Sequence, residues 1–449
     1  MPGPGVHQHP GLRAQPPGAA PRRCWPRFAE RLLRRRRVGD AGGGARGLQA
    51  RHGPGPGGRH GRRGDPRRSV LAVHRRPLRG VHRRAAPRHR SWRRAPFREV
   101  HRGDPAGRAA GAVRVLVTGG TGFVGSHAAR ALQDAGHTVR LLVRTPSKLS
   151  TVTERVGVDL AALETIEGDI RDAVAVTAAV DGCDAVVHAA AVVSIAPTAE
   201  AEVSETNLAG ALNVLGAAVD AGCDPVVHVS TGEALFPFRT DPVTADHPVG
   251  TAPGAYARSK AQSEHLARRY QAQGHSVVIV YPALTIGPGD YGGSVQLQPM
   301  KLWLTKPLPR SGYTMTMVDV RDVAAVIAAA MEAGRGPRRY LMFGHHLSAD
   351  ELLSELQSVT GRDLKSVPMP RALFSMWGRV GDVANRFGRD LVLTTEAVDY
   401  MFNYCAGDNS ATERDTGITL RPVAESLADT FAWMRDEGYV TSAQAGAVP

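Results

Sequence analysis

Segment 113–144, VRVLVTGGTGFVGSHAARALQDAGHTVRLLVR, constrains the fold more than any other part of the chain. It joins a short apolar run, a glycine-rich turn, a helical pattern that ends at Gly136, and a second apolar run. This order predicts a strand, a helix and a second strand parallel to the first. Gly119, Gly122 and Gly125 form a GxxGxxG spacing, which permits a tight turn and lets a pyrophosphate approach the backbone at the start of the helix. The segment predicts an α/β, Rossmann-type doubly wound parallel sheet that binds a dinucleotide; a turn without a ligand is the alternative.

The end of the second predicted strand distinguishes between the two nicotinamide cofactors. An acidic residue there binds the 2′-hydroxyl of the adenosine ribose, whereas an arginine accommodates a 2′-phosphate. Val143 ends the apolar run, Arg144 follows it, Lys148 lies just beyond, and no acidic residue is in reach. The pattern therefore predicts NADP, with NAD as the alternative. The two basic side chains could also simply be solvated in a loop.

A second group of residues has the chemistry of proton transfer. Tyr256 and Lys260 are four residues apart in a segment with helical period, so they share one face of the helix. A tyrosine alone is a weak acid, with a pKa of about 10, and a neighbouring ammonium favours its phenolate form. Thr231, at the end of the preceding apolar strand, could hold the substrate oxygen beside the phenol, with Ser230 as the alternative.

Several histidines look functional but have simpler interpretations. His188 lies in the apolar run DAVVHAAAVVS, so we expect it to be packed in the core. His345 and His346 are adjacent and therefore do not share a helix face, and no third ligand is near. We interpret this pair as a turn and expect no metal site.

Taken together, the motifs resemble the extended short-chain dehydrogenase/reductase superfamily, also called the NAD-dependent epimerase/dehydratase family. They occur in the family's order over nearly all of residues 113–435. The matching segments are TGGTGFVG (118–125), GDI (168–170), HAAA (188–191), NLAGALNVL (207–215), VST (229–231), YARSK (256–260), GPGD (287–290) and VDVRDVA (318–324).

The resemblance implies a catalytic group of Thr231, Tyr256 and Lys260, supported by Asn207, with Lys260 also binding the nicotinamide ribose. Asp169 would receive the edge of the adenine. The residues expected to contact the cofactor are Gly119, Thr121, Gly122, Phe123, Val124, Gly125, Arg144, Lys148, Asp169, Ile170, Ala189, Ala190, Tyr256, Lys260 and Pro282.

The segment VRLLVRTPSK is similar to the dihydroflavonol reductase and 3β-hydroxysteroid dehydrogenase branch of the family, whose reductases have an arginine at this point. That likeness implies an NADPH-dependent reductase of a bulky apolar or steroid-like ketone. The segment GEALF, after Thr231, lacks the Tyr-Gly that sugar-nucleotide members often carry. A sugar-nucleotide epimerase or dehydratase and a non-catalytic NADP sensor are the alternatives.

The remaining chain divides into a dinucleotide-binding domain with the catalytic residues, 113–290, and a segment, 291–449, expected to form mainly a smaller C-terminal substrate lobe with parts that return to the main domain. Within the lobe, 367–387 predicts a helix with one apolar face, and a substrate lid or a membrane-surface helix is the alternative. Its apolar residues include Met369, Leu373, Phe374, Met376 and Trp377.

The first part of the chain has a different composition. Residues 1–110 contain 28 Arg, no Lys and 5 acidic residues, a net charge of +23, while the rest of the chain has 28 basic and 37 acidic residues, a net charge of −9. We expect this leader, 1–112, to be disordered. A nucleic-acid-binding arm and a transit peptide are alternatives, but missing Lys and scarce Ser favour a mis-set start, with the natural chain beginning at Val113.

Residues 113–449 should bind a small-molecule substrate and no nucleic acid. No apolar run is long enough to span a membrane, and the four cysteines show no pairing or metal-ligand spacing. These features predict a cytoplasmic protein. A homodimer is suggested by the resemblance alone.

Overall fold

The computed structural model describes residues 113–193, 199–389, 391 and 393–448. The expectation of a disordered leader concerns residues that lie outside this set. Within it, no helix combines the length and the apolar character needed to cross a bilayer.

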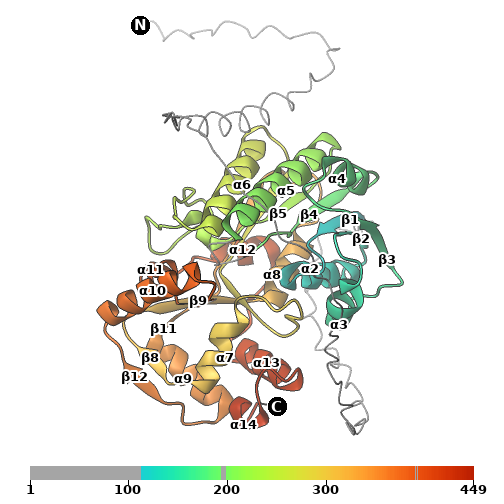
Figure 1. The fold of residues 1–449 in the computed structure, drawn as a ribbon. Helices are drawn as coiled ribbons and strands as arrows, with labels where there is room; N and C mark the ends of the chain where they lie inside the picture. Colours follow the sequence, from blue (N-terminus) through green and yellow to red (C-terminus); the bar gives the residue numbers. More distant parts are fainter. Residues whose placement is uncertain (1–112, 194–198, 390, 392, 449) are drawn as a thin grey trace, which may run out of the picture. The chain divides into compact units, whose positions relative to one another are not determined.

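The main sheet has seven parallel strands in the order β10-β6-β5-β4-β1-β2-β3 (Figure 1). The chain winds outward from β1 in both directions, which confirms the predicted doubly wound sheet. The strands are β1 (Arg114–Thr118), β2 (Thr138–Val143), β3 (Leu163–Glu167), β4 (Ala185–His188), β5 (Val226–Val229), β6 (Val277–Pro282) and β10 (Arg338–Met342).

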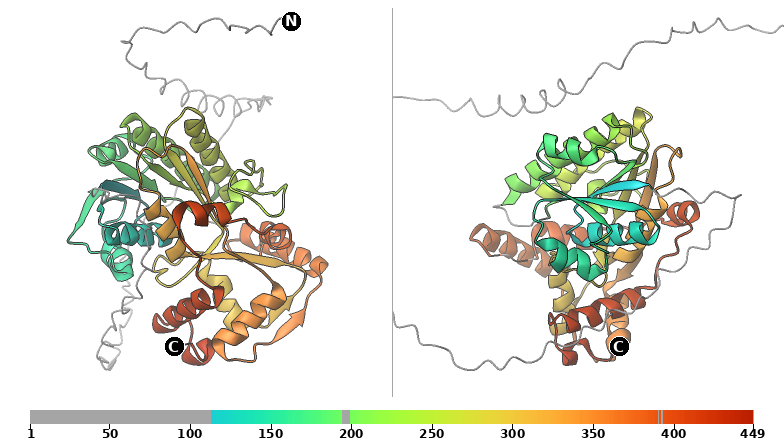
Figure 2. Two further views of the ribbon diagram at one scale, coloured as in Figure 1. Left: turned by 180° about the vertical axis from the view of Figure 1, so that it is seen from behind. Right: turned by 90° about the vertical axis from the view of Figure 1, so that its right-hand side faces the viewer.

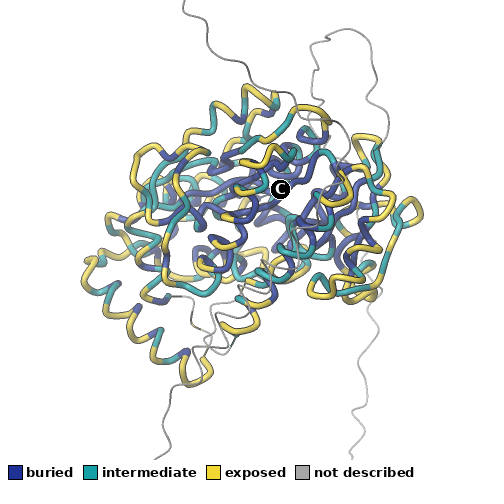
Figure 3. Tube along the Cα trace, turned by 90° about the horizontal axis from the view of Figure 1, so that it is seen from above, coloured by how far each residue is buried: buried dark blue, intermediate teal, exposed yellow. Residues whose placement is uncertain are grey.

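Helices cover both faces of this sheet (Figure 2). Alternation along β1 sends Val115 and Val117 to one face and Leu116 to the other. The first face packs against α2 (Phe123–Asp134) and α8 (Val320–Ala329). The second packs against α4 (Ala173–Val180), α5 (Glu200–Asp220) and α6 (Ala255–Ala272). The sheet is buried on both sides, as the near-continuous apolar strands require, and Figure 3 shows the buried trace concentrated there.

A second, smaller part of the fold is built mostly from residues after 283. A three-stranded sheet has the order β11-β9-β7, and β8 pairs with β12. These strands are β7 (Leu284–Ile286), β8 (Leu308–Arg310), β9 (Thr314–Asp319), β11 (His345–Ser348) and β12 (Ser366–Pro368). The helices are α7 (Leu297–Thr305), α9 (Ala349–Thr360), α10 (Arg371–Arg386), α11 (Thr395–Asn403), α13 (Val423–Asp436) and α14 (Ser442–Ala445).

Not all of the later chain belongs to this smaller part. Strand β10 lies at the edge of the main sheet, and α8 packs beneath that sheet against α2. A short helix, α12 (Ser410–Thr416), lies beside β10, where the Thr412 hydroxyl donates to the carbonyl of Leu341 at 2.9 Å. The C-terminal third therefore contributes to both parts of the fold.

The expectation that His345 and His346 form a turn is wrong. Both residues lie in β11, which pairs antiparallel with β9. The chain reverses one residue earlier, at Gly344, whose φ is +71° and whose added Cβ would lie 2.1 Å from the carbonyl oxygen of Met317. Only glycine fits this approach, so pairing with a distant strand decides the conformation of the two histidines.

Candidate active site

The expected site residues gather at one edge of the main sheet. Because all seven strands are parallel, their carboxyl ends lie at the same edge, where doubly wound folds bind their ligands. The expected residues that end or follow β1 to β6 are Gly119, Arg144, Asp169, Ala189, Thr231 and Pro282, in that order.

The glycine turn after β1 brings two backbones unusually close. Gly119 has a φ of +79°, and a Cβ added there would lie 2.6 Å from the backbone nitrogen of Ala190. A Cβ added at Gly125 would lie 2.2 Å from the carbonyl oxygen of Gly119. Helix α2 starts at Phe123, and its N-cap, Gly122, has no side chain that could occupy the first amide groups. The turn therefore leaves a glycine cradle and an open helix N-terminus, which fit a pyrophosphate. The remaining expected residues of this stretch, Thr121 and Val124, lie in the turn and in the first turn of α2.

The other end of the cofactor site lies beyond β2 and β3. Arg144 and Lys148 are exposed directly after β2. Asp169 accepts hydrogen bonds from the guanidinium of Arg171 at 3.0 and 2.7 Å, which holds the pKa of this carboxyl below its usual range. The side chain of Ile170 packs directly against Gly210, where an added Cβ would lie 2.3 Å from its Cδ1. An open hollow of about 380 Å³ here is lined by Asp169, Arg171, Asp172 and Glu205.

The three expected catalytic side chains come together from β5 and α6. Thr231 lies two residues after β5, and its hydroxyl lies beside the phenol of Tyr256 in the first turn of α6. Lys260 lies one turn further along the same helix face. Its ammonium donates to the carbonyl of Val229 at 2.7 Å, and the residue is only 4% exposed.

Burial sets the protonation of this group. It lowers the pKa of Lys260 to about 8, against the smaller opposing effect of Glu264. Burial also raises the pKa of Tyr256, and the carboxyl of Glu233 raises it further, while the Thr231 hydroxyl lowers it. The sequence led us to expect a lowered phenol pKa beside the ammonium; here it is raised, because desolvation of the phenolate is the largest effect. Tyr256 is thus a protonated acid at neutral pH.

Asn207 connects the segments around the catalytic group. It is buried in α5, where its amide oxygen accepts from the backbone nitrogen of Val192 at 2.7 Å. Its amide nitrogen donates to the carbonyl of Val192 and to the hydroxyl of Ser259, both at 3.0 Å. The Ser259 hydroxyl in turn donates to the carbonyl of Tyr256. Asn207 therefore fixes α6 against the segment that follows β4, where Ala189 and Ala190 lie.

Two acidic and two aromatic residues near this group were not expected from the sequence. Glu233 follows Thr231, and its backbone nitrogen donates to the threonine hydroxyl at 3.4 Å. Burial and Glu396 raise the pKa of Glu233 to about 8. Glu396 accepts from the hydroxyl of Tyr400 at 3.0 Å. The hydroxyl of Tyr404 lies 2.0 Å from the Cβ position of Gly232, in the turn after Thr231. Glu396 and Tyr400 lie four residues apart in α11 and Tyr404 directly follows that helix, and this spacing gave no signal that they face Tyr256.

Two histidines lie behind Lys260. The rings of His188 and His228 stack at 5.6 Å, and both are almost fully buried. Burial, and then the charge of Lys260, lower the pKa of both, to about 3 for His188. The Nδ1 of His188 is hydrogen-bonded to the hydroxyl of Thr118 at 2.8 Å. The predicted core role of His188 is confirmed.

Residues 115–342 match the NAD dependent epimerase/dehydratase family. The chain belongs to this family. It is accordingly an NAD(P)-dependent oxidoreductase, and the glycine cradle and open helix N-terminus at the end of β1 fit such a cofactor.

Other members show the range of related chemistry. The chain is 30% identical to sterol demethylase protein B of Methylococcus capsulatus over 335 residues, 72% of this chain and 99% of that protein. It is 25% identical to cinnamoyl-CoA reductase 2 of Arabidopsis thaliana, over 73% and 93% of the two chains. Among solved structures, dTDP-glucose 4,6-dehydratase of Streptomyces venezuelae with NAD bound is 29% identical, with a TM-score of 0.55 over 73% and 98% of the chains.

In this epimerase/dehydratase family member, the paired histidines of β11 have structural partners. His345 is hydrogen-bonded to the carbonyl of Arg421 at 2.6 Å, and His346 to the hydroxyl of Thr316 at 2.6 Å. Across the described part of the chain, no group of three or more His, Cys, Asp or Glu is arranged to hold a metal ion.

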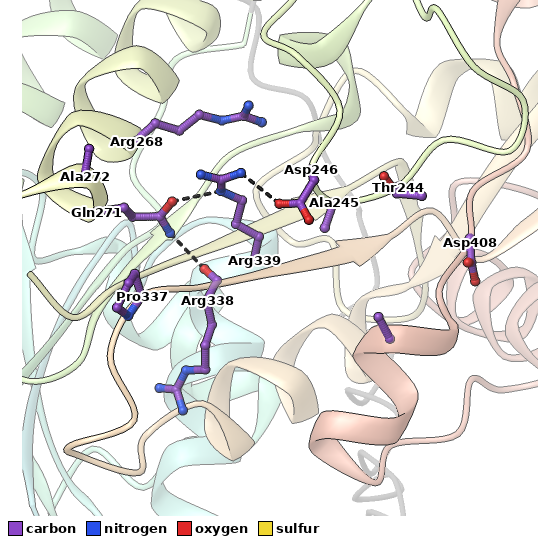
Figure 4. Close-up of a pocket in the computed structure, with 11 residues that line it drawn as sticks. Thr244, Ala245, Asp246, Arg268, Gln271, Ala272, Pro337, Arg338, Arg339 and Asp408 are labelled. Atoms are coloured by element: carbon purple, nitrogen blue, oxygen red, sulfur yellow. Dashed lines mark hydrogen bonds and ion pairs between the residues drawn. The ribbon is translucent and has the colours of Figure 1, made fainter. Parts of the chain in front are cut away.

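A pocket of about 470 Å³ lies apart from the catalytic group, between α6, β10 and α12 (Figure 4). Its polar side chains bind one another: Arg339 donates to Gln271 at 2.8 Å and to Asp246 at 2.9 Å, and Gln271 donates to the carbonyl of Arg338 at 3.0 Å. None of the expected site residues lines it.

Proposed function

We propose that the protein is an NADPH-dependent reductase that interconverts a ketone and a secondary alcohol on a bulky apolar, steroid-like substrate. The observation that carries this proposal is that the hydroxyl of Thr231, after β5, lies beside the phenol of Tyr256, one helical turn from the buried ammonium of Lys260. These are two oxygen groups able to bind one carbonyl oxygen, with a positive charge behind them. The sterol demethylase relative supports a large, apolar substrate, and the cinnamoyl-CoA reductase relative supports a reduction.

The chain's own residues would hold both reactants. The glycine cradle would bind the pyrophosphate, Arg144 and Lys148 the 2′-phosphate, and Lys260 the nicotinamide ribose. When bound, the reduced nicotinamide supplies a hydride to the carbonyl carbon. Thr231 donates a hydrogen bond to the carbonyl oxygen and so orients it.

Tyr256 gives the proton that this oxygen needs. Its raised pKa keeps the phenol protonated before the reaction, which suits reduction. Transfer of the proton leaves a phenolate, and the ammonium of Lys260 lowers the cost of that negative charge. The phenolate then takes a proton from water, which returns the enzyme to its starting form.

Aromatic rings next to the catalytic group favour an apolar substrate. The ring of Tyr400 lies 4.8 Å from that of Phe236, and the ring of Tyr404 lies 4.8 Å from that of Phe238. Phe343 is 5.3 Å from Tyr404. Phe236 and Phe343 are buried behind the tyrosine rings and make the surroundings of Tyr256 apolar, while Glu233 adds one polar group that could bind a hydroxyl of the ligand.

A sugar-nucleotide epimerase or dehydratase is the second candidate. The carboxyl of Glu233 favours it, because a second proton-transferring group beside Tyr256 is more than ketone reduction requires. The solved dTDP-glucose 4,6-dehydratase relative also favours it. In such a reaction the hydride returns to the same molecule, so the cofactor is not consumed.

The test is a measurement of NADPH oxidation with steroid-like ketones and, separately, of product formation from sugar nucleotides. The Tyr256→Phe variant should lose at least about 100-fold in rate, since it cannot give the proton. Tyr270→Phe, on the same helix but away from the group, is the control and should keep full activity. Sugar conversion without net NADPH oxidation would establish the second candidate. Tight NADPH binding with no turnover of either substrate class would indicate a sensor.

A further inference from the structure

The outer side of α10 is apolar although it faces solvent. Met376, Val380, Val383 and Phe387 follow one another at spacings of four, three and four residues, so they form one stripe along the helix. They are 51%, 45%, 53% and 83% exposed. We refer to these four residues as the α10 stripe.

The α10 stripe is held in a fixed position. The opposite side of α10 packs closely on the segment before α11, where a Cβ at Gly381 would lie 2.0 Å from the carbonyl oxygen of Leu393. Asn385 exchanges two hydrogen bonds with the backbone of Leu391, at 2.7 and 3.0 Å. Asp382 accepts from the backbone nitrogen of Thr395 at 3.2 Å. The helix can therefore not turn its apolar side inward without losing these contacts.

Basic side chains border the stripe. Arg379 and Arg386 are seven residues apart and lie along one edge of it, and Arg389 follows the helix. All three are exposed. This local positive charge contrasts with the net −9 of the chain after residue 110. Trp377, 50% exposed, lies on the other edge.

We propose that α10 is a membrane-surface helix whose stripe enters the headgroup boundary of an anionic lipid bilayer. An apolar stripe with arginines on one edge and a tryptophan on the other matches that boundary, because acyl chains accept the stripe and acidic headgroups accept the guanidinium groups. A second copy of the chain fits less well. It would bring the arginines of two identical faces together, and the carboxylate of Asp382 is already bonded to Thr395.

This arrangement would also place the catalytic group near the lipid. Helix α11, which packs against α10, carries Glu396 next to Gly254 at the start of α6. The next step rests on the proposed function: an apolar ketone would then pass directly between the bilayer and the active site. Lipid binding itself does not depend on that function, and its test needs no substrate.

The first test uses the full chain and reads out Trp377 alone. Because the Arg-rich leader would itself bind anionic vesicles, total binding is not informative. The emission of the Trp377→Phe variant, subtracted from that of the wild type, isolates Trp377. With vesicles of phosphatidylcholine and phosphatidylglycerol, this emission should shift to shorter wavelength, and bromine on the acyl chains should quench it by about twofold or more. Unchanged emission would refute the proposal.

A second test removes either the stripe or its charge. At 1 M salt, which screens the leader, the Val380→Gln/Val383→Gln/Phe387→Gln variant should partition into the same vesicles about tenfold less than the wild type. The control variant, Val174→Gln/Leu302→Gln, removes two exposed apolar residues elsewhere and should partition normally. If the stripe variant and the control variant partition equally into the vesicles, the proposal that the stripe enters the bilayer is refuted. All variants should keep the wild-type melting temperature and NADPH affinity.

At physiological salt, the Arg379→Gln/Arg386→Gln variant should show weaker quenching of Trp377. If the quenching of Trp377 is unchanged, the arginines do not give α10 a preference for anionic lipids. Self-association that the stripe variant abolishes, without any quenching of Trp377 by lipid, would replace the bilayer by a second copy of the chain.

Discussion

Lys260→Met is expected to remove catalysis and yet to stabilise the protein at neutral pH. Burial lowers the pKa of Lys260 from 10.5 to about 8, so the folded state disfavours the ammonium. At pH 7 the side chain is charged in both the folded and the unfolded states, and the shift corresponds to a penalty of about 3 kcal/mol. Methionine has no charge to bury, but it leaves the carbonyl of Val229 without its donor, at a cost of about 1–3 kcal/mol.

The pH dependence isolates the charge. The penalty is fully present below the folded pKa and is lost as the pH rises from about 8 to 10.5, because the ammonium then loses its proton. At pH 9.5 it has fallen to about 1.4 kcal/mol. The stability of Lys260→Met relative to the wild type should therefore decrease by about 2 kcal/mol between pH 7 and pH 9.5.

Urea unfolding of both proteins at the two pH values measures this difference. Lys301→Met, an exposed lysine on α7, is the control and should change stability by less than about 0.5 kcal/mol at either pH. A difference between Lys260→Met and the wild type that stays constant across this pH range would refute the reasoning. Such a result would mean that Lys260 is not a buried ammonium in the folded protein at pH 7.

Three further predictions concern the cofactor site and the buried acid. Gly125→Ala should weaken NADPH binding at least about tenfold, because its Cβ would lie 2.2 Å from a backbone oxygen; Gly312→Ala, with open space around it, should bind normally in the same titration. Arg144→Glu should shift the ratio of NADPH to NADH affinity by about tenfold or more toward NADH, and an unchanged ratio would place the 2′-phosphate elsewhere. Glu233→Gln should gain stability over the wild type in urea unfolding as the pH rises from 5 to 8. The reason is that the wild-type carboxyl stays protonated in the folded protein but ionises in the unfolded chain, which costs the wild type stability. Glu332→Gln, at an exposed position, is the control and should show no such trend.

The sequence alone determined the features that depend on neighbouring residues. The glycine turn is specified locally, because each glycine is needed by the turn itself or by the helix that follows it. The shared helix face of Tyr256 and Lys260 likewise follows from a spacing of four residues. Apolar runs joined by helical patterns were enough to predict a parallel sheet, and in a parallel sheet the carboxyl ends of the strands meet.

The tertiary structure decided what depends on distant residues. The pKa of Tyr256 is raised because burial outweighs the effect of its neighbours, and no pattern in the sequence reports burial at that depth. Glu396 and Tyr404 lie near the catalytic group only because α11 packs over the start of α6. His345 and His346 lie in a strand because β9 supplies their hydrogen-bond partners. For α10 the sequence predicted one apolar face but could not say whether it points inward. Packing against α11 decided that, because glycines and Asn385 face the partner and the apolar side chains are left to the solvent.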